Sequence, residues 1–254
     1  MPSDPQFRRL VESIGFVGFG EFGQFFARCL APNFKITVCD QADRRDDARA
    51  IGVAWGSLAE VAAKDLVVLS VPLKAMEAVL VALKPHLAAT TTLMDVCSVK
   101  QEPIRLIREH LPQADLIATH PLFGPQSYSL PNVQCKLVVC PPEKLSARHE
   151  FLLAHFRDAL RLTIIEVPAE QHDREMANVQ ALSHFVAKAL AEIDVRASEL
   201  STPSYDLLVQ FMGLLAKDSW ELFETIQKGN PFAAGVREGL LKALTDLNTR
   251  LESK

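Results

Sequence analysis

The sequence predicts an α/β fold with a mostly parallel sheet, followed by an all-helical second half. Strand-like apolar runs alternate with helical stretches from Ser13 to about Val167, and a glycine-rich turn follows the first run. No strand-like run follows Pro168. We therefore expect a first domain over residues 1–168 and a helical domain over residues 169–254.

The alternation depends on apolar runs that are nearly continuous, as is typical of strands buried on both faces of a parallel sheet. The expected strands are Ile14–Gly18, Phe34–Cys39, Leu66–Val71, Thr91–Val96, Leu116–Thr119, Leu137–Cys140 and Leu162–Val167. The expected helices are Glu21–Leu30, Leu73–Leu87, Pro103–Glu109 and Leu145–Leu160.

The second half is expected to contain four helices. The pattern predicts one long helix over Ala169–Ile193 and another over Pro203–Lys217. Asp218-Ser219-Trp220-Glu221 resembles a capping box that begins a third helix, Gly229 ends it, and Asn230-Pro231 precedes the last. These helices carry many apolar residues for a region of this size, so we expect a homodimer that forms through this half.

Composition excludes several function classes. The net charge is −4 with both signs mixed along the chain, and this argues against nucleic-acid binding. The five cysteines form no C-x-x-C pair, so we expect reduced thiols, a cytoplasmic protein and no metal site. The N-terminal residues contain no apolar segment typical of a signal peptide, and no run is long enough to span a membrane.

The glycine-rich turn predicts a phosphate-binding site. A strand, this turn and a helix in succession are typical of a Rossmann-like dinucleotide-binding fold. Gly18 permits the tight turn, Gly20 lets backbone N–H groups approach a pyrophosphate, and Gly23 lets the helix pack on the strand. The expected cofactor contacts are Gly18, Phe19, Gly20, Glu21, Phe22 and Gly23.

Asp40 indicates which dinucleotide would bind. It ends the second expected strand, 22 residues after Gly18, where an acid accepts the ribose hydroxyls and repels a 2′-phosphate. We therefore expect NAD rather than NADP. Arg44 and Arg45 lie nearby and leave NADP as the alternative, although neighbouring aspartates balance their charge.

Polar residues follow three strands at the edge where ligands of such folds bind. Ser70 and the nearby Pro72 follow the third expected strand, Ser98 follows the fourth, and His120 follows the fifth. We expect Ser70, Pro72 and Ser98 to lie near the cofactor. An imidazole such as His120 suits a general base that takes a proton from a hydroxyl as hydride leaves.

Each of these residues has a structural alternative. His120 equally fits a histidine that caps a strand end or bonds a loop carbonyl. Ser98 fits a helix-capping serine, and Lys100 fits a solvated loop charge that could instead meet a substrate carboxylate.

The chain resembles the prephenate/arogenate (cyclohexadienyl) dehydrogenase family of tyrosine biosynthesis from Ile14 to about Leu240. Beyond the glycines, four motifs carry the resemblance. They are Asp95-Val96-x-Ser98-Val99-Lys100, His120-Pro121-Leu122-Phe123-Gly124-Pro125-x-Ser127, His172-Asp173-x-x-Met176-Ala177 and Gln180-Ala181-Leu182-x-His184-Phe185.

The resemblance implies an oxidoreductase that decarboxylates prephenate, arogenate or both while hydride passes to NAD. His120 would take the proton of the ring hydroxyl, with Ser98 between that hydroxyl and the nicotinamide. It also implies substrate contacts by Ser127 and His184. Asp173, Gln180 and His184 share one helical stripe, so we expect them to face the substrate together.

One departure concerns the substrate. Bacterial prephenate-using relatives typically carry a carboxylate-binding arginine where this chain has Leu214, and plant arogenate enzymes lack it too. Lys100, Arg174 and Arg237 are candidate replacements. The ammonium group of arogenate would need an acid such as Asp173.

Two other functions fit parts of the sequence. Another NAD-dependent hydroxy-acid dehydrogenase would rely on a lysine of the long helix, where Lys188 is the candidate. A non-catalytic dinucleotide-binding dimer would need the glycine turn but neither His120 nor Ser98.

Overall fold

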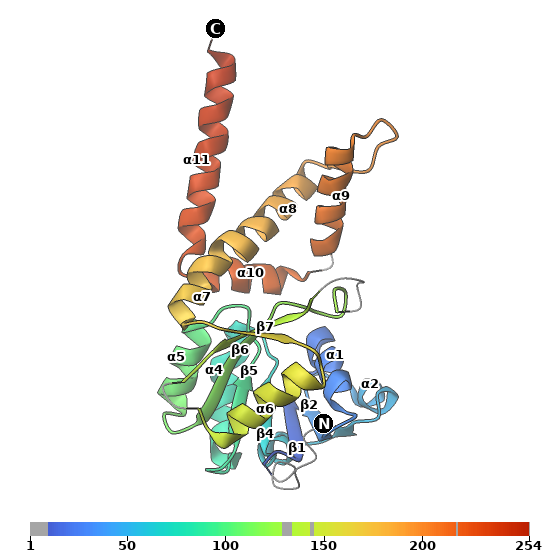
Figure 1. Ribbon diagram of the computed structural model, residues 1–254, viewed down its shortest axis with the longest axis vertical. Coiled ribbons are helices and arrows are strands. Elements are labelled where there is room, and N and C mark those ends of the chain that lie inside the picture. The colour runs from blue at the N-terminus through green and yellow to red at the C-terminus, as the bar shows by residue number, and fades with distance from the viewer. Residues whose placement is uncertain (1–9, 129–133, 143–144, 217, 254) are drawn as a thin grey trace. The chain divides into compact units, whose positions relative to one another are not determined.

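The computed structural model describes residues 10–128, 134–142, 145–216 and 218–253. The chain divides into two compact units, Met1–Ala169 and Glu170–Lys254 (Figure 1). Within the described residues, no helix combines the length and the apolar character that a membrane crossing requires.

Among the described residues of the N-terminal unit, eight strands form one sheet. They are β1 (Ser13–Val17), β2 (Lys35–Cys39), β3 (Ala54–Trp55), β4 (Leu66–Leu69), β5 (Thr92–Asp95), β6 (Asp115–Pro121), β7 (Lys136–Cys140) and β8 (Thr163–Glu166). Their order is β3-β2-β1-β4-β5-β6-β7-β8, and every neighbouring pair is parallel except β6 and β7. The predicted α/β fold with a mostly parallel sheet is confirmed.

Helices cover both faces of this sheet. They are α1 (Glu21–Leu30), α2 (Arg45–Ala50), α3 (Leu58–Ala62), α4 (Leu73–Leu83), the 3₁₀ turn Lys84–His86, α5 (Gln101–His110) and α6 (Ala147–Asp158). One apolar cluster packs α1, α2 and α6 on one face, where Figure 1 shows α6 in front of the strands. A second cluster packs α3, α4 and α5 on the other face.

The sheet has its switch point between β1 and β4. From β1 the chain continues into α1 on one face, and from β4 it continues into α4 on the other. Such neighbours leave a crevice beyond their carboxyl ends, where ligands of doubly wound folds bind. The residues after Val17 and Leu69 therefore define the place to look for a site.

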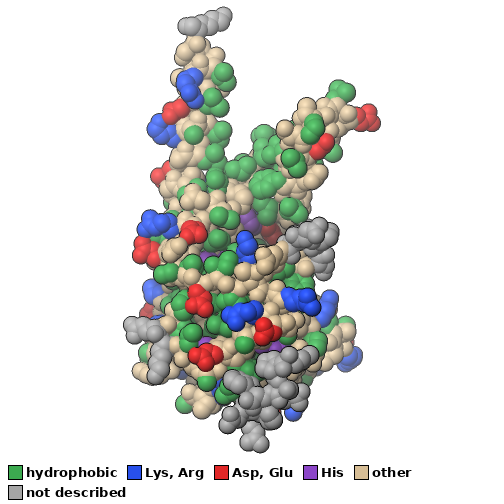
Figure 2. Space-filling model, viewed as in Figure 1, with side chains coloured by type: hydrophobic (Ala, Val, Ile, Leu, Met, Phe, Trp, Pro, Cys, Tyr) green, Lys and Arg blue, Asp and Glu red, His purple; other side chains and the backbone are tan. Residues whose placement is uncertain are grey.

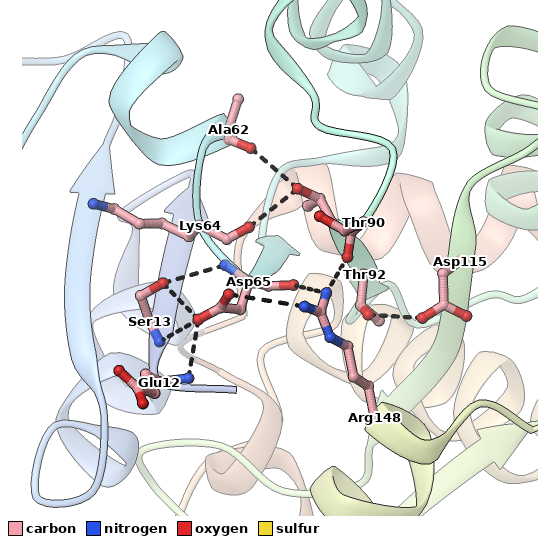
Figure 3. Close-up of polar contacts among 10 residues, drawn as sticks. Glu12, Ser13, Ala62, Lys64, Asp65, Thr90, Thr92, Asp115 and Arg148 are labelled. Carbon is pink, nitrogen blue, oxygen red and sulfur yellow. Dashed lines mark hydrogen bonds and ion pairs between the residues drawn. The ribbon is translucent and has the colours of Figure 1, made fainter. Parts of the chain in front are cut away.

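A polar network joins the opposite, amino ends of the strands (Figure 3). Asp65 Oδ2 accepts hydrogen bonds from the N–H groups of Glu12 and Ser13 and from the Ser13 hydroxyl, each at 2.9 Å. Arg148 of α6 donates to the carbonyl of Thr90 and lies 3.9 Å from the Asp65 carboxylate. This network ties β1, β4 and α6 together far from the carboxyl-end crevice.

The second unit is helical in its described residues. Its elements are α7 (Ala169–Met176), a π-helical turn (Ala177–Ala181), α8 (Leu182–Glu192), α9 (Pro203–Leu215), α10 (Trp220–Gly229) and α11 (Ala233–Glu252). Thr202 and Ser219 cap α9 and α10 by accepting the N–H groups of Tyr205 and Leu222. Ala181, Ile226 and Ala233 form its small core.

The predicted long helix over Ala169–Ile193 is present as α7, the π turn and α8, which run without a break from Ala169 to Glu192, but its middle is π-helical rather than α-helical. At the π turn, Leu182 N–H donates to the carbonyl of Ala177, five residues back. The widened turn releases carbonyl groups, which side chains then satisfy. The Ser183 hydroxyl donates to the carbonyls of Val179 and Gln180, and Gln227 Nε2 donates to that of Ala181 at 2.6 Å.

Some elements of the first unit also differ from the expectation. The two-residue strand β3 and the short helices α2 and α3 were not predicted, because such short segments show no clear periodicity. Strand β6 continues through Pro121, so His120 lies within the strand rather than after it. There it pairs with Val138 of the antiparallel neighbour β7.

Candidate active site

The glycine turn adopts a geometry that its three glycines make possible. Gly18 has φ +93°, and a Cβ there would stand 2.2 Å from the carbonyl oxygen of Ser70. A Cβ on Gly23 would stand 2.4 Å from the carbonyl oxygen of Gly18. At Gly20 nothing lies within 4 Å of the Cβ position, so open space lies beside the backbone there.

Gly20 precedes the first residue of α1, and the N–H groups at such a helix start have no partner within the helix. A helix N-terminus next to open space is suited to bind an anion. The side chains of this segment serve other purposes. Phe19 is fully buried, and the Phe22 ring packs on Phe25 and Phe26. Phe19 and Phe22 therefore offer backbone groups rather than side chains to a ligand, and Glu21 is exposed.

Asp40 has a structural role that the sequence analysis missed. Its Oδ2 accepts the N–H of Phe19 at 2.6 Å, and its Oδ1 accepts the N–H of Ala42 at 2.9 Å. The carboxylate thus holds the glycine turn against the end of β2. Because each carboxylate oxygen accepts two hydrogen bonds, the half-buried Asp40 retains acceptor capacity for a hydroxyl donor.

Ser70 lies directly beneath the turn. Its N–H donates to the carbonyl of Val17 at 2.8 Å, and its hydroxyl is 3.3 Å from the position of a Cβ on Gly23. Pro72 is exposed and precedes the first residue of α4. The structure therefore brings Ser70 into contact with the glycine turn and leaves Pro72 at the start of the next helix.

Ser98 and His120 belong to neighbouring segments at the carboxyl edge. Strands β5 and β6 are paired with Asp95 opposite Ala118, so both chain segments continue past this level on the same side. Ser98 is half-buried in the loop after β5, and His120 is 3% exposed near the end of β6. The two segments therefore bring a buried imidazole and a half-buried hydroxyl to the same edge of the sheet, an arrangement that suits a base and a hydrogen-bond donor acting on one ligand.

Lys100 is not the solvated loop charge that the sequence allowed. Its side chain is fully buried, and its ammonium group pairs with the equally buried Asp95. Nζ also donates to the carbonyl of Thr119. This ammonium group is therefore engaged inside the unit, which argues against its binding a substrate carboxylate.

Ser127 closes a turn after the histidine motif. Its hydroxyl accepts the N–H of Gly124 at 3.0 Å, while its own N–H donates to the carbonyl of Gly124. The next residue, Tyr128, packs its ring on Phe25 and Phe123. These contacts give Ser127 a local structural role.

In the helical unit, His184 of α8 lies beside Asp218. His184 Nδ1 is 3.6 Å from the Asp218 carboxylate, and the Asp218 side chain is 23% exposed. Burial lowers the pKa of His184 below its usual value, while the Asp218 carboxylate opposes that shift. From the sequence alone, Asp218 is expected only to be part of a helix cap. The local sequence signal that could have pointed to this contact is an acid beside an N-cap serine.

Gln180 lies one turn before His184. Its side-chain Oε1 is buried and has no hydrogen-bond partner among the described residues. A buried, unpartnered acceptor is costly, because desolvation is not compensated. The oxygen is therefore suited to accept a hydrogen bond from a ligand.

Asp173, the first residue of the predicted stripe, is engaged by neighbours within its own unit. It is fully buried, its Oδ1 lies 2.8 Å from His172 Nδ1, and its backbone carbonyl accepts a hydrogen bond from Asn230 Nδ2. Eleven residues of helix also separate it from His184 by about 16 Å. Asp173 and His172 stabilise the start of this unit instead.

The other candidate carboxylate anchors are also engaged. Arg237 Nη1 donates to the backbone and side-chain oxygens of Gln227 at 2.9 and 2.8 Å. Arg174 lies 4.4 Å over the Phe232 ring and donates to Glu170. Leu214 is 59% exposed on α9. No group of three or more potential metal ligands occurs among the described side chains.

Comparison with known proteins gives two family matches. The family "Prephenate dehydrogenase, nucleotide-binding domain" matches residues 26–145, a range that begins after the glycine turn. The family "TYRAAT1-like, C-terminal domain" matches residues 189–254. The first match agrees with a nucleotide-binding N-terminal unit.

Relatives align along nearly the whole chain. A probable arogenate/prephenate dehydrogenase of Methanocaldococcus jannaschii is 27% identical over 93% of this chain and 56% of its own length. Arogenate dehydrogenase 1, chloroplastic, of Arabidopsis thaliana is 29% identical over 94% of this chain and 39% of its own length. The chain thus spans about half or less of these two relatives.

A solved structure has the same fold. Prephenate dehydrogenase from A. aeolicus, in complex with hydroxyphenyl propionate and NAD⁺, superposes with a TM-score of 0.74 at 23% identity. The match covers 94% of this chain and 90% of that chain.

Proposed function

The chain belongs to the prephenate/arogenate dehydrogenase family, and we propose that it oxidatively decarboxylates arogenate, prephenate or both in tyrosine biosynthesis, with NAD as hydride acceptor. The observation that carries this proposal concerns the carboxyl edge of the sheet in the N-terminal unit. It presents the glycine turn, the Ser98 hydroxyl and the buried His120 imidazole. A dehydrogenase needs an anion cradle and a base, and we assign these roles to the glycine turn and to His120.

The proposed reaction uses the two strand-end residues as follows. His120 accepts the proton of the ring hydroxyl as hydride leaves the ring carbon that carries this hydroxyl. NAD, when bound, accepts that hydride. The bond between the ring and its carboxylate then breaks, and CO₂ departs. The electrons of that bond complete the aromatic ring, and the proton returns to the ring oxygen to give a phenol. Ser98 donates a hydrogen bond to the reacting oxygen and keeps it directed at His120.

The choice of NAD depends on Asp40 and its surroundings. Backbone N–H groups hold both oxygens of this carboxylate beside the glycine turn, where we expect it to accept the ribose hydroxyls and repel a 2′-phosphate. Arg44 lies 3.3 Å from Asp47, and Arg45 lies 3.5 Å from Asp43. With these guanidinium groups paired to acids, we propose NAD over NADP.

For the location of the protein we propose the cytoplasm. The free thiols among the described residues suit the reducing cytosol.

For the substrate side chain we propose arogenate as the preferred compound. Asp173 is buried against His172, so we assign the ammonium contact to Asp218 instead. Its partly exposed carboxylate lies beside the His184 ring and in the same unit as the unpartnered Gln180 oxygen. A carboxylate recognises an ammonium group by a charge-assisted hydrogen bond, whereas the keto group of prephenate gains nothing from it.

The test of the function is NADH formation by the purified protein, with arogenate and prephenate in parallel, each with NAD and NADP. We expect turnover of arogenate with NAD. Oxidation of a simple hydroxy acid, with both cyclohexadienyl acids untouched, would favour the alternative dehydrogenase that uses Lys188. NAD binding without any turnover would favour a non-catalytic dimer.

Replacing Asp218 with asparagine should shift the substrate preference. We expect kcat/KM for arogenate to fall about 10–100-fold relative to that for prephenate, because a charged hydrogen bond is lost. The measurement is a parallel assay of both substrates. Asp206→Asn removes the same charge from the first turn of α9 and should leave the ratio unchanged. An unchanged ratio in Asp218→Asn would refute the assignment.

We propose that two chains associate through α11. Leu240, Leu244, Leu247 and Leu251 recur at intervals of four and three residues, the spacing of a coiled-coil seam. Leu244, Leu247 and Leu251 are 54%, 48% and 78% exposed in the single chain. Figure 2 shows hydrophobic side chains at the surface along this helix.

The leucine seam of α11 leads to a prediction about the oligomeric state, which sedimentation measures. Leu244→Glu with Leu247→Glu should convert a dimer to a monomer, because four charges would face one another in the seam. Lys242→Glu with Thr249→Glu places two acids on the opposite side of α11 and should keep the dimer. A dimer that survives the first pair would rule out this interface.

A further inference from the structure

Asp95 and Lys100 form a fully buried ion pair at the carboxyl edge of the sheet. Asp95 is the last residue of β5, and Lys100 immediately precedes α5. Both side chains are 0% exposed, and the ammonium group contacts Asp95 Oδ1. Burying two charges removes them from water at a cost that their attraction often fails to repay. The pair therefore calls for an explanation other than stability.

The pair contacts the residues that precede the two proposed catalytic residues in the chain. Lys100 Nζ donates to the carbonyl of Thr119, the residue before His120. The Thr119 hydroxyl donates back to the carbonyl of Asp95 at 2.6 Å. Asp95 Oδ1 also accepts, at 3.1 Å, the N–H of Cys97, the residue before Ser98. One buried pair thus connects the Ser98 loop to the strand that carries His120.

This connection resists displacement because its polar groups are sealed from water. If either segment moved, a buried carbonyl, ammonium or carboxylate group would lose its partner with no solvent to replace it. Burial raises the pKa of Asp95, and the Lys100 ammonium opposes that rise, so the carboxylate depends on its partner for its charge. Asp95 Oδ2 already lacks a hydrogen-bond partner among the described residues.

We propose that Asp95 and Lys100 are positioning residues that set the separation and orientation of Ser98 and His120 for proton transfer. The inference rests on the proposed function. It also gives Lys100 a role other than carboxylate binding. A base must lie within hydrogen-bond reach of its proton, and a displacement of about 1 Å can lower the rate about 10²-fold.

The test uses the double variant Asp95→Asn/Lys100→Met in the full chain. Asparagine keeps an oxygen for the Cys97 N–H, methionine keeps the length of the lysine stem, and neither change leaves a buried charge unpaired. The matched control is Arg148→Met, which breaks the polar network at the opposite, amino-end edge of the same sheet (Figure 3). Each protein is assayed at a temperature where circular dichroism shows it fully folded.

We expect kcat of the double variant to fall about 10–100-fold, as misplacement of the base predicts, with the KM for substrate and the Kd for NAD within about threefold of wild type. Arg148→Met should keep kcat within about twofold, because distant sites act independently. A folded double variant with wild-type kcat would overturn the proposal. A rise in KM at unchanged kcat would also overturn it and make Lys100 a substrate ligand.

Hydrogen exchange separates this inference from the proposed function. Backbone amides of residues 96–99, 120 and 122–124 should exchange about tenfold faster in the double variant than in wild type, and at the wild-type rate in Arg148→Met. Unchanged exchange in the double variant would overturn the positioning role even if the enzyme were active. Failure of the wild-type protein to convert arogenate or prephenate would instead refute the proposed function. The exchange experiment would still test whether the buried pair holds the two segments in place.

Discussion

Replacing His120 with asparagine is expected to lower kcat about 10²–10⁴-fold while NAD binding stays unchanged. Asparagine can hydrogen-bond to the ring hydroxyl but cannot take its proton, and a positioned base contributes a factor of this size. His120 is 3% exposed on β6, so the variant side chain has little freedom to recruit water as a substitute base. The measurements are steady-state kinetics with arogenate and fluorescence titration with NAD.

His149→Asn is the control for this substitution. His149 is equally buried in the same unit, and its Nε2 lies 3.0 Å from Asp115 at the amino end of β6. We expect its loss to lower the unfolding midpoint without a change in kcat. If His120→Asn retained wild-type turnover, or if both variants lost it equally, His120 would be a structural histidine and not the base.

Replacing Gly18 with alanine is expected to disrupt both the turn and NAD binding. The new Cβ would stand 2.2 Å from the Ser70 carbonyl oxygen, which is backbone and cannot move aside cheaply. The residue would also keep a φ of +93°, which disfavours any side chain. We expect unfolding free energy to fall by about 3 kcal/mol or more, and NAD affinity to fall by more than about 10²-fold. Denaturant unfolding and NAD titration measure the two effects.

Substitutions at two other glycines distinguish the effect of backbone strain from the effect of a lost ligand contact. Gly20→Ala meets no atom within 4 Å and has φ −70°, so stability should change by less than about 0.5 kcal/mol while NAD affinity falls. Gly52→Ala has φ +74° with open space around it, so it should cost about 1–2 kcal/mol and leave NAD binding intact. Wild-type NAD affinity in Gly20→Ala would argue against pyrophosphate binding at this turn.

Some of the candidate site was predictable from local sequence. The helix Glu21–Leu30 was predicted with its observed bounds, because its apolar periodicity and the glycines before it are local signals. The order of Ser70, Ser98 and His120 along one edge follows from the order of the parallel strands β4, β5 and β6, which precede the two serines and carry the histidine. The boundary of β6 was placed too early, because pairing with β7 rather than local preference carries the strand through Pro121.

Charged residues were predicted less well, because their partners lie elsewhere in the chain. Lys100 was interpreted as a loop charge or a substrate ligand, yet the fold buries it against Asp95 and Thr119. Asp173 was grouped with His184 by helical spacing, yet it bonds its neighbour His172. Spacing places side chains on one face of a helix, but it does not say which groups compete for them.

The sequence by itself determined the fold class and the glycine turn. Alternating apolar runs leave few arrangements other than a buried parallel sheet, and a backbone at φ +93° requires a residue such as Gly18. The tertiary structure alone decided which polar groups meet. Asp218 reaches His184, and Gln227 stabilises a π turn 46 residues away, through contacts that no local pattern encodes. Burial makes such contacts selective, because a polar group without a partner costs free energy in the interior.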